Sequence, residues 1–373
     1  MNKKVKIAFD AKWYFEGPVS NKIVITNLID NFKGFATSSS RNELFLLIDK
    51  KFKYSDEVKS LKDFKIIFVF NINTLLTNTI ILPFILLWNR IDVALVQNYT
   101  PVLSTSKIIT YVHDVIFLSN PEFFTLIERL YFWPIKYLLR QSEKIITISK
   151  SEKNRIIKYC KVPEEKIKYI YHGVSTGFKP KSEIDELNKS RVIKKFDLPD
   201  NFILFVGRLN IRKNIETLIK AFSIIDTPNV KLVILGEKSW KSSHLMPLIN
   251  SLNIQKDVFS LNDVKDDELK VIYALAKVFC FPSLEEGFGL PPLEAMACGI
   301  PVVVSNSSSI PEVCGEAGLY HNPKDFNMLA LHLKNLLNDN KIYKHHSEQS
   351  LIRAQKFNWS NSASSLLEAC KKL

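Results

Sequence analysis

Short apolar runs rich in β-branched residues alternate with helical segments along most of the chain, and this alternation constrains the fold more than any other feature. In the first half the strand-like runs cover residues 5–10, 44–49, 64–70, 92–97, 107–114, 144–149 and 167–173. In the second half they cover residues 202–208, 230–236, 257–261, 278–283 and 300–305. Continuous apolar strands separated by helices predict an α/β fold with parallel sheets that helices cover on both faces.

A polar, proline-containing stretch divides this pattern into two halves. We expect an N-terminal Rossmann-like, acceptor-side domain over residues 1–175, a linker over 176–200 and a C-terminal Rossmann-like domain over 201–356. The last helix, at about 357–373, is expected to cross back onto the first domain. Two doubly wound domains that face one another form a central cleft at the carboxyl ends of their sheets, where ligands bind.

The positive charge of the chain is concentrated in its first half. Residues 1–180 carry 27 Lys and Arg against 16 Asp and Glu, whereas residues 181–373 carry 24 against 22. A basic surface of this kind suits an anionic membrane or a nucleic acid, and it is equally compatible with a solvated lysine-rich face. No stacking aromatic cluster in a recognised RNA or DNA motif supports a nucleic-acid partner.

The chain shows no segment typical of membrane insertion or export. The most apolar stretch, residues 74–88, is interrupted by Asn78 and Pro83, and no window reaches the ~18 apolar residues of a membrane span. The run upstream of it, residues 64–73, breaks at Asn71 and Asn73, and over the two stretches together we expect a buried strand followed by a core helix. The start, MNKKVKIAFDAKW, lacks the apolar core of a signal peptide. Five cysteines without a paired spacing favour a reducing compartment.

A loop rich in glutamate and glycine follows the strand-like run at 278–283. Gly287 and Gly289 lack a Cβ atom, so the backbone N–H groups beside them can approach a ligand closely. Two prolines suit the first turn of the following helix, and Gly299 suits its end. A helix start with nearby N–H groups favours phosphate, whereas the carboxylate of Glu286 favours sugar hydroxyls. A nucleotide sugar carries both groups; the alternative is a tight turn that binds nothing.

Four other candidate residues belong to three loops that follow predicted strands. Arg208 and Lys213, in FVGRLNIRKN, can hold a diphosphate and offset its charge, or they are surface charges at a helix start. His113 can bond a sugar hydroxyl and steady developing positive charge, or it is a structural histidine. Gly17, in FEGPVSNK, is a candidate for a phosphate- or acceptor-binding loop.

These motifs together resemble the retaining glycosyltransferases of family 4, which have the GT-B fold. The resemblance is close over the second half, in SLEEGFGLPPLEAMACGIPVVVSNSSSIPEVCGEAGLY at 283–320, with FVGRLNIRKN and HDV upstream, and looser over the first half. Its most specific element is a pair of glutamates separated by seven residues, Glu286 and Glu294. The segment HDVIFLSNPEFF at 113–124 looks like the form found in mannosyltransferases of surface polysaccharide assembly.

The resemblance implies a role for each of the candidate residues. It implies catalytic roles for Glu286, His113, Arg208 and Lys213. It implies that the donor is bound by Gly17, Arg208, Lys213, Glu286, Gly287, Phe288, Gly289, Leu290 and Glu294. In this scheme Glu286 and the following amides hold the donor sugar, Glu294 bonds the ribose hydroxyls, and the two cations grip the diphosphate. The chain departs from the family with a single glycine in the first loop and with Asn262 where glycine is usual; we expect Asn262 to adopt a positive φ.

The expected reaction needs no cofactor. Transfer passes through a sugar that resembles an oxocarbenium ion, with a nucleoside diphosphate as the leaving group. The Asp-x-Asp pair of metal-dependent transferases is absent, so the leaving charge falls to Arg208, Lys213 and the helix dipole, and we expect no metal. Retention by a covalent intermediate and retention by a front-face route both remain open.

The resemblance thus implies a hexosyltransferase of surface polysaccharide synthesis, such as lipopolysaccharide, with mannose favoured. The donor is expected to be GDP-mannose or a UDP-hexose, and the acceptor a glycan or a lipid-linked glycan. The protein is expected in the cytoplasm, with peripheral binding to the inner face of an anionic membrane. The alternatives are a non-hydrolysing sugar-nucleotide epimerase of the same architecture and an inactive scaffold. The absence of a GxGxxG fingerprint argues against a nicotinamide or flavin enzyme.

Overall fold

The computed structural model describes residues 4–38, 42–227, 229–236 and 245–373. The chain forms two compact units. The first unit comprises Met1–Gly173 together with Asn358–Leu373, and the second comprises Val174–Phe357. Among the described residues no helix is both long and apolar enough to cross a membrane.

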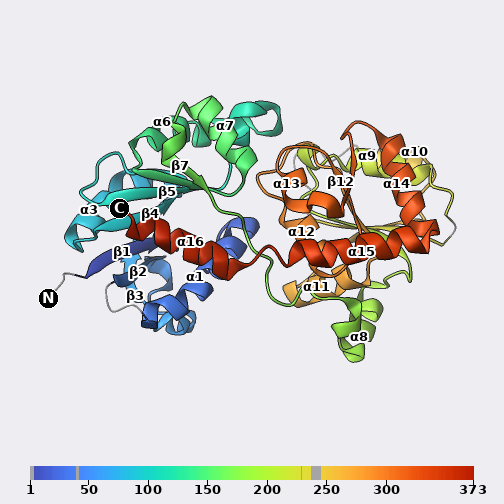
Figure 1. Ribbon diagram of the computed structural model, residues 1–373, viewed down its shortest axis with the longest axis horizontal. Helices are drawn as coiled ribbons and strands as arrows, with labels where there is room; N and C mark the ends of the chain where they lie inside the picture. The colour runs from blue at the N-terminus through green and yellow to red at the C-terminus, as the bar shows by residue number, and fades with distance from the viewer. Residues whose placement is uncertain (1–3, 39–41, 228, 237–244) are drawn as a thin grey trace. The chain divides into compact units, whose positions relative to one another are not determined.

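The first unit is built on a seven-stranded parallel sheet in the order β3-β2-β1-β4-β5-β6-β7. Its strands are β1 Val5–Asp10, β2 Asn42–Asp49, β3 Lys65–Val69, β4 Val93–Gln97, β5 Lys107–Val112, β6 Lys144–Thr147 and β7 Ile167–Tyr169. Figure 1 shows the strands of this unit in that order, with helix α16 crossing over them. The central strands are almost wholly buried because helices cover both faces, as their uninterrupted apolar sequences predict.

Two groups of helices cover the two faces of this sheet. On one face lie α1 (Val19–Ser38) and the C-terminal α16 (Trp359–Lys371). Phe9 of β1 meets Phe32 of α1 edge to face, and Leu366 of α16 lines a small apolar cavity beside Phe9. The predicted return of the last helix to the first unit is confirmed.

The other face of the sheet is covered by two helical layers that lie in sequence between its strands. The first is α2 (Thr74–Leu76), the π-helical turn η3 (Thr77–Ile81) and α3 (Leu82–Trp88). The second comprises α4 Ile116–Ser119, α5 Leu126–Phe132, α6 Ile135–Leu138 and α7 Lys150–Cys160. Both layers pack on the same face, because Ala94 and Ile108, which contact α3, and Val112 and Ile145, which contact α6 and α7, point to one side of the sheet.

Residues 74–88 are helical throughout, but only one side of this helical segment is buried in the core. Leu82 and Leu86 are fully buried against the sheet, whereas Phe84 is 71% and Trp88 88% exposed. The π-turn immediately before Pro83 gives room to a proline ring that cannot donate to the preceding turn. The expectation of a core helix was therefore wrong for one face of this segment.

The second unit is a six-stranded parallel sheet in the order β10-β9-β8-β11-β12-β13. Its strands are β8 Phe202–Val206, β9 Lys231–Leu235, β10 Val258–Leu261, β11 Val278–Phe281, β12 Val302–Ser305 and β13 Gly318–His321. Its helices are α8 Glu186–Phe196, α9 Ile215–Ser223, α10 Leu245–Ser251, α11 Asp266–Leu275, α12 Leu290–Ala297, α13 Ile310–Cys314, α14 Phe326–Asn338 and α15 Asn340–Ala354. The pattern of apolar runs did not predict β13, whose four residues begin with a glycine and end with a histidine.

Two local expectations differ from the structure. Residues 176–200, expected as a linker, contain α8, which is capped by Asp185, packs on α11 and belongs to the second unit. The stretch looked like a linker because most of α8 is exposed and therefore polar. After β10 the positive φ falls on Asp263, at 53°, and not on Asn262. Aspartate tolerates this conformation as asparagine does, so the turn moves by one residue.

Candidate active site

The loop after β8 carries three basic residues: Arg208, Arg212 and Lys213. Lys213 lies in a short 3-10 turn, Ile211–Lys213, whose start is capped by Asn210: its side-chain oxygen accepts from the backbone N of Lys213. Asn214 follows with a φ of 53°, and its amide donates to the carbonyl of Pro282 at 2.9 Å. The capped turn and this hydrogen bond between the two loops place the loop after β8 directly beside the loop after β11.

A buried carboxylate connects these two loops. Glu286, only 6% exposed, accepts from Lys213 Nζ through Oε1 at 2.7 Å and from Arg212 Nη1 through Oε2 at 2.9 Å. Arg212 also donates to the carbonyl of Glu285 at 2.7 Å. Lys213 Nζ lies 4.6 Å from the centre of the Phe281 ring, at the end of β11. The cluster therefore holds two cations and one anion at the carboxyl edge of the sheet.

The charges of this cluster are set by competition between burial and pairing. Burial alone would raise the pKa of Glu286, but Arg212 and Lys213 outweigh it and hold that pKa below its ordinary value. Burial lowers the pKa of Lys213 to about 8; Arg212 and Arg208 lower it as well, while Glu286 opposes them. Glu286 is thus ionised at neutral pH, and Lys213 is a cation close to losing its proton.

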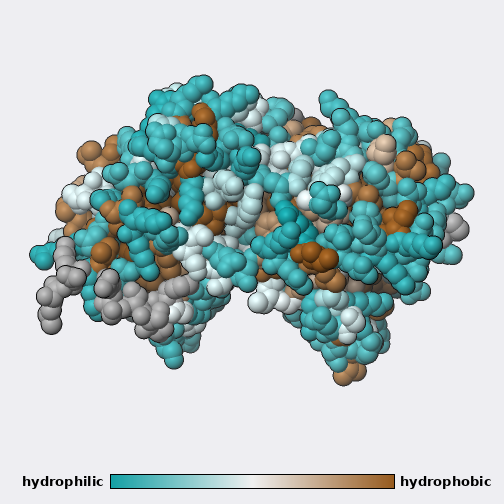
Figure 2. Space-filling view, viewed as in Figure 1, coloured by the Kyte–Doolittle hydropathy of each residue, from teal (hydrophilic) through white to brown (hydrophobic). Residues whose placement is uncertain are grey.

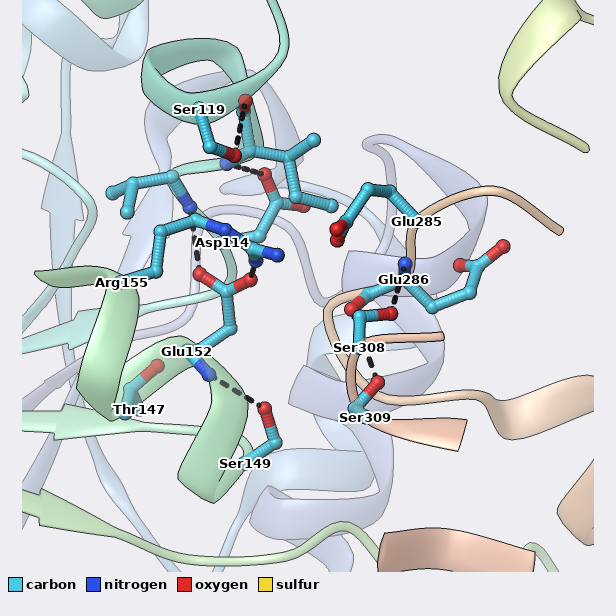
Figure 3. Close-up of polar contacts among 12 residues, drawn as sticks. Asp114, Ser119, Thr147, Ser149, Glu152, Arg155, Glu285, Glu286, Ser308 and Ser309 are labelled. Atoms are coloured by element: carbon cyan, nitrogen blue, oxygen red, sulfur yellow. Dashed lines mark hydrogen bonds and ion pairs between the residues drawn. The ribbon is translucent and has the colours of Figure 1, made fainter. Parts of the chain in front are cut away.

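Serines from the loop after β12 fix the shape of the glutamate loop. Ser308 Oγ accepts from the backbone N of Glu286 at 2.8 Å. Ser309 Oγ donates to the carbonyls of Glu286 and Phe288, at 3.0 and 2.7 Å. Figure 3 shows Glu286 and Ser308 joined in this way, with Ser309 beside them. The run SNSSS, to which the sequence reasoning assigned no role, therefore positions the backbone around Glu286.

Gly289 forms the junction between this loop and helix α12. Its φ of 117° is one that residues with side chains rarely adopt, and a Cβ atom there would lie 2.8 Å from Ile310 Cδ1. Prolines occupy the first turn of α12, where their missing N–H groups cost nothing. Gly287, Phe288 and Leu290 lie in this same turn, next to Glu286. Their predicted binding of a donor stays a prediction.

Glu294 lies one helical turn further along α12 and differs from Glu286 in its surroundings. It is 8% exposed, and burial raises its pKa to about 7, with the nearby Tyr273 acting in the opposite direction. The sequence reasoning treated the two glutamates as a pair, but the structure makes one a paired anion and the other a carboxyl that titrates near neutrality.

Arg208 occupies an exposed position just after β8. Its side chain has no hydrogen bond or ion pair with any residue that the structure describes, yet it lies near enough to Lys213 to lower the pKa of that amine. Arg208, Arg212 and Lys213 therefore form a three-residue basic cluster. Arg212 was missed by the sequence reasoning, although it stands next to Lys213 in the same motif.

His113 is buried at the end of β5 in the first unit. Its Nε2 lies 2.9 Å from Gln97 Oε1 at the end of β4, and its ring contacts Trp13 and Tyr111. Burial lowers the pKa of His113 to about 3, so the ring is neutral. Gln97 Nε2 donates to the carbonyl of Asp10, which turns Oε1 toward the ring. The proton of His113 therefore sits on Nε2, and Nδ1 is the acceptor.

A buried network of hydrogen bonds holds Gln97 in position. Asp10 Oδ1 accepts from Lys12 Nζ at 2.6 Å, and Lys12 also donates to Asn78 Oδ1 at 2.8 Å. Asn78 in turn donates to the carbonyl of Gln97 at 2.9 Å. Asn78 lies on the π-turn, whose widened geometry brings it into the network. The sequence reasoning assigned none of these four residues a role at the site, because they come from three distant segments.

Gly17 lies in the loop between β1 and α1. A Cβ atom at this position would lie 2.8 Å from Trp13, the residue whose ring packs against His113. The structure thus connects Gly17 with His113 through one tryptophan. No contact with a phosphate follows from this arrangement, and the predicted donor-binding role of Gly17 remains a prediction.

A second carboxylate holds the loop that follows His113. Glu152, fully buried on α7, accepts from the backbone N of Val115 at 3.0 Å and pairs with Arg155. Its own backbone N donates to Ser149 Oγ, the cap of α7, as Figure 3 shows. Asp114 accepts from the backbone N of Ile116 and so shapes the same loop. The HDV motif is therefore anchored on both sides.

The structure gathers the predicted residues into two groups. Arg208, Lys213, Glu286 to Leu290 and Glu294 lie together at one edge of the second sheet, and His113 and Gly17 lie together at one edge of the first. Among the described residues there is no group of three or more His, Cys, Asp or Glu side chains arranged to hold a metal ion. All five cysteines are buried free thiols.

Two family models match the sequence. The model described as Glycosyl transferases group 1 matches residues 187–352, and the one described as Glycosyltransferase Family 4 matches residues 48–178. The O-antigen chain mannosyltransferase B of Escherichia coli is 30% identical over 272 residues, which are 72% of this chain and 71% of that protein. The serotype-specific mannosyltransferase WbdA of Escherichia coli is 31% identical over 281 residues, but this chain spans only 34% of its length.

Solved structures show the same architecture over almost the whole chain. A sucrose-phosphate synthase from Thermosynechococcus elongatus has a TM-score of 0.76 at 19% identity and covers 99% of both chains. HepE of Anabaena, in complex with UDP and glucose, has a TM-score of 0.74 at 18% identity and covers 99% of this chain and all of its own. The predicted GT-B fold is confirmed. With its two family models and a relative that it matches over most of both lengths, the chain belongs to the family 4 glycosyltransferases.

Proposed function

We propose that the protein transfers a hexose, with retention, from a nucleoside diphosphate sugar to a glycan or lipid-linked glycan of a cell-surface polysaccharide. Mannose from GDP-mannose is the first candidate, because the O-antigen mannosyltransferase that matches most of this chain carries that sugar in its name. The observation that carries the proposal is the buried Glu286, held between Arg212 and Lys213 in the loop after β11.

The cluster suits the departure of a diphosphate. As the bond between the sugar carbon and the phosphate oxygen breaks, negative charge grows on the leaving group, and Lys213 and Arg208 attract it. Glu286 holds Lys213 Nζ in place before the reaction, so little reorganisation is needed. Arg208 has no partner among the described residues and is available to a phosphate. The same proposal has the reaction proceed without a metal.

In this proposal the acceptor is bound by the first unit. The neutral ring of His113 meets a hydroxyl of the transferred sugar, and its fixed tautomer leaves Nδ1 as an acceptor. The surplus of basic residues in this unit suits an acceptor that carries a phosphate or pyrophosphate on a lipid. The protein would then work in the cytoplasm, at the inner face of an anionic membrane.

A panel of donors tests the donor class. The purified chain is incubated with GDP-mannose, UDP-glucose, UDP-galactose and UDP-N-acetylglucosamine, and release of the nucleoside diphosphate and the shift in melting temperature are measured. GDP-mannose is expected to give the fastest release of nucleoside diphosphate and the largest rise in melting temperature. A UDP-hexose would be the second candidate, since HepE is a fold neighbour seen with UDP and glucose. No response to any nucleotide sugar would contradict the proposal.

Variants of neighbouring residues connect that activity to the site. Glu286→Gln and Arg208→Ala are each expected to lower turnover by roughly a hundredfold or more, because each removes a charge from the site. Glu285→Gln serves as the matched control in the same loop, since the hydrogen bond that Arg212 donates to residue 285 goes to its backbone carbonyl, which the substitution keeps. Near-normal turnover in both site variants would contradict the assignment. Chelation of divalent metals is expected to leave the rate unchanged.

The epimerase alternative makes a different product. An epimerase would convert the nucleotide sugar into its isomer, whereas a transferase without an acceptor releases the nucleoside diphosphate slowly into water. Separation of the products by ion-exchange chromatography distinguishes the two. An isomerised nucleotide sugar with no free diphosphate would replace the transferase proposal.

A further inference from the structure

More than half of the large apolar side chains that are exposed among the described residues come from one stretch of the first unit. Of the 26 large hydrophobic side chains that are exposed within the described part of the chain, 14 lie between residues 70 and 137. Monomeric soluble proteins rarely expose apolar side chains in such density without a partner.

The first part of this surface is a stripe along α2, the π-turn and α3. Its members recur every fourth residue and are 39–88% exposed: Ile72, Leu76, Ile80, Phe84 and Trp88. The opposite side of the same helical segment is buried on the sheet. Residues 66–89 contain no charged side chain, so no ionised group of this segment interrupts the stripe.

The second part lies on α5 and α6. Its members are 43–67% exposed and occupy one side of the two helices: Leu126, Leu130, Trp133 and Tyr137. The opposite side is buried in the cluster around Ile135 and Leu139. Arg129, Lys136 and Arg140 stand among these apolar residues, and Lys136 and Arg140 lie over the Tyr137 ring.

The two stripes belong to one layer of the unit. Both cover the same face of the sheet, and Leu75 of α2 packs against the cluster that includes Tyr131 and Ile135. Between them runs the segment 98–106, where Tyr99 donates to the carbonyl of Tyr131 and where Val102 and Leu103 are exposed. We call this surface, formed by the two stripes with Val102 and Leu103, the apolar face.

On the view in Figure 2, brown side chains stand in separate groups among teal ones, and some lie at the left edge of the first unit, where Figure 1 labels α3. The apolar face includes two tryptophans and a tyrosine, and the basic residues Arg129, Lys136 and Arg140 stand among its side chains. Tryptophan and tyrosine beside lysine and arginine form the composition that proteins use at the boundary between lipid headgroups and acyl chains.

We propose that the apolar face inserts into the surface of a lipid bilayer and holds the first unit on it. The inference rests on the proposed function, because an acceptor carried by a lipid must be met at a membrane. Charge favours a bilayer over a second copy of this chain: the first unit carries 28 Lys and Arg against 17 Asp and Glu, so two copies repel while anionic headgroups attract.

The apolar face is coupled to the candidate site through shared elements. The stripe on α2 and α3 lies on the outer side of the helix whose inner side places Asn78 against Gln97, the partner of His113. The chain also runs directly from His113 through α4 into α5. The same elements thus connect a bilayer at the apolar face with the edge of the first sheet that carries His113.

Insertion of apolar side chains predicts a salt dependence different from that of a basic patch. Binding by charge alone is lost when salt is raised from 0.05 to 0.5 M, because screening shortens the reach of each charge. Binding through the apolar face keeps most of its strength in high salt. Sedimentation of the full chain with vesicles of phosphatidylcholine containing about 30% phosphatidylglycerol measures this directly.

Paired variants test which residues are responsible. Phe84→Ser with Trp88→Ser is expected to lower partition onto the vesicles roughly tenfold or more, because two large side chains no longer enter the bilayer. The control is Leu187→Ser with Ile352→Ser, a pair of exposed apolar residues in the second unit, which is expected to bind as the unaltered chain does. Release of diphosphate from the donor in the absence of lipid is expected to stay unchanged in both pairs.

Two further measurements identify the occupant. Brominated lipids are expected to quench the fluorescence of Trp88 and Trp133. The variants Trp88→Phe and Trp133→Phe measure how much of the quenching comes from each tryptophan. Sedimentation velocity over a range of protein concentrations reports self-association. Equal binding of both variant pairs to vesicles, or a dimer abolished by Phe84→Ser with Trp88→Ser, would overturn the proposal. Donor turnover without vesicle binding would overturn it while leaving the proposed function in place.

Discussion

At the scale of single residues, the candidate site of the second unit combines two glutamates and one lysine whose titration differs because their neighbours differ. Glu286 is paired with two cations, Glu294 is buried with a tyrosine beside it, and Lys213 is buried beside two arginines. Each group therefore leaves a separate mark on the pH dependence of donor use.

Lys213 is expected to set the alkaline limit of activity. Its pKa of about 8 means that it loses its charge, and its attraction for a diphosphate, as the pH rises through that value. For the free enzyme kcat/KM should fall about tenfold per pH unit above pH 8. Lys213→Arg keeps its charge at all these pH values, so its profile should lack this fall. An unchanged alkaline limit in that variant would rule out Lys213 as its source.

Glu294 is expected to set the acidic limit. Below its pKa of about 7 it is a neutral carboxyl and a weaker acceptor for sugar hydroxyls, so KM for the donor should rise as the pH falls. Glu294→Gln should bind the donor roughly tenfold to a hundredfold more weakly above pH 7 and show no acidic limit. A profile of Glu294→Gln that keeps the limit contradicts the assignment.

The same residue affects stability with a sign that can be worked out. The pKa of Glu294 is higher in the folded protein than its ordinary value of 4.5, so the folded state binds the proton more tightly. This contribution to stability is complete below pH 4.5 and is lost as the pH rises through 7. Glu294→Gln should therefore melt at a higher temperature than the unaltered protein at pH 8, measured by calorimetry.

At the scale of elements, the strand–loop–helix unit β11–α12 depends on one backbone conformation. Gly289→Ala combines a φ of 117° with a Cβ 2.8 Å from Ile310, and a strained residue of this kind costs about 1–3 kcal/mol. We expect a lower free energy of unfolding in urea and a loss of donor binding. Gly34→Ala is the control, because a Cβ on Gly34 of α1 meets nothing within 4 Å and alanine favours a helix. Equal stability of the two variants would show that the turn tolerates a side chain.

The elements themselves follow closely from the sequence pattern, with two instructive exceptions. Strands β1 to β12 were anticipated because each is a short run of apolar, β-branched residues. β13 was not, because its pairing with β12, and not its own composition, makes it a strand. The π-turn at Thr77–Ile81 was not anticipated either, because no local signal distinguishes a π-turn from an α-helix that contains a proline.

At the scale of the whole molecule, the chain passes out of the first unit after Gly173 and returns to it at Asn358. A Cβ atom on Gly173 would lie 2.2 Å from the backbone N of Trp359, the first residue of α16. Ser362 of α16 donates to the carbonyl of Tyr171 beside it. The returning helix is thus fitted against the end of the segment that leaves the unit.

Gly173→Ala is expected to loosen the C-terminal helix. The backbone of Trp359 must move away from the new methyl group, so α16 should lose protection in amide hydrogen exchange, along with the face of α1 that packs on it. Amide exchange in the strands of the second unit should stay as in the unaltered protein. In the control variant Gly34→Ala, all helices should keep their protection. Unchanged protection of α16 would mean that the contact can relax without cost.

The amino-acid sequence by itself determined that this protein has two α/β halves, that it is a family 4 glycosyltransferase, that Glu286 and Glu294 belong to one motif, and that Arg208 and Lys213 belong to another. These properties are local: hydrophobic period, turn residues and motif spacing are written within short segments. Only the tertiary structure decided that Arg212 and Lys213 share Glu286, and that Asp10, Lys12, Asn78 and Gln97 support His113. It also decided that residues 72–88 present a face to the outside. Such facts depend on which segments, far apart in the chain, come to lie against one another, and burial and pairing then set the charge of each group.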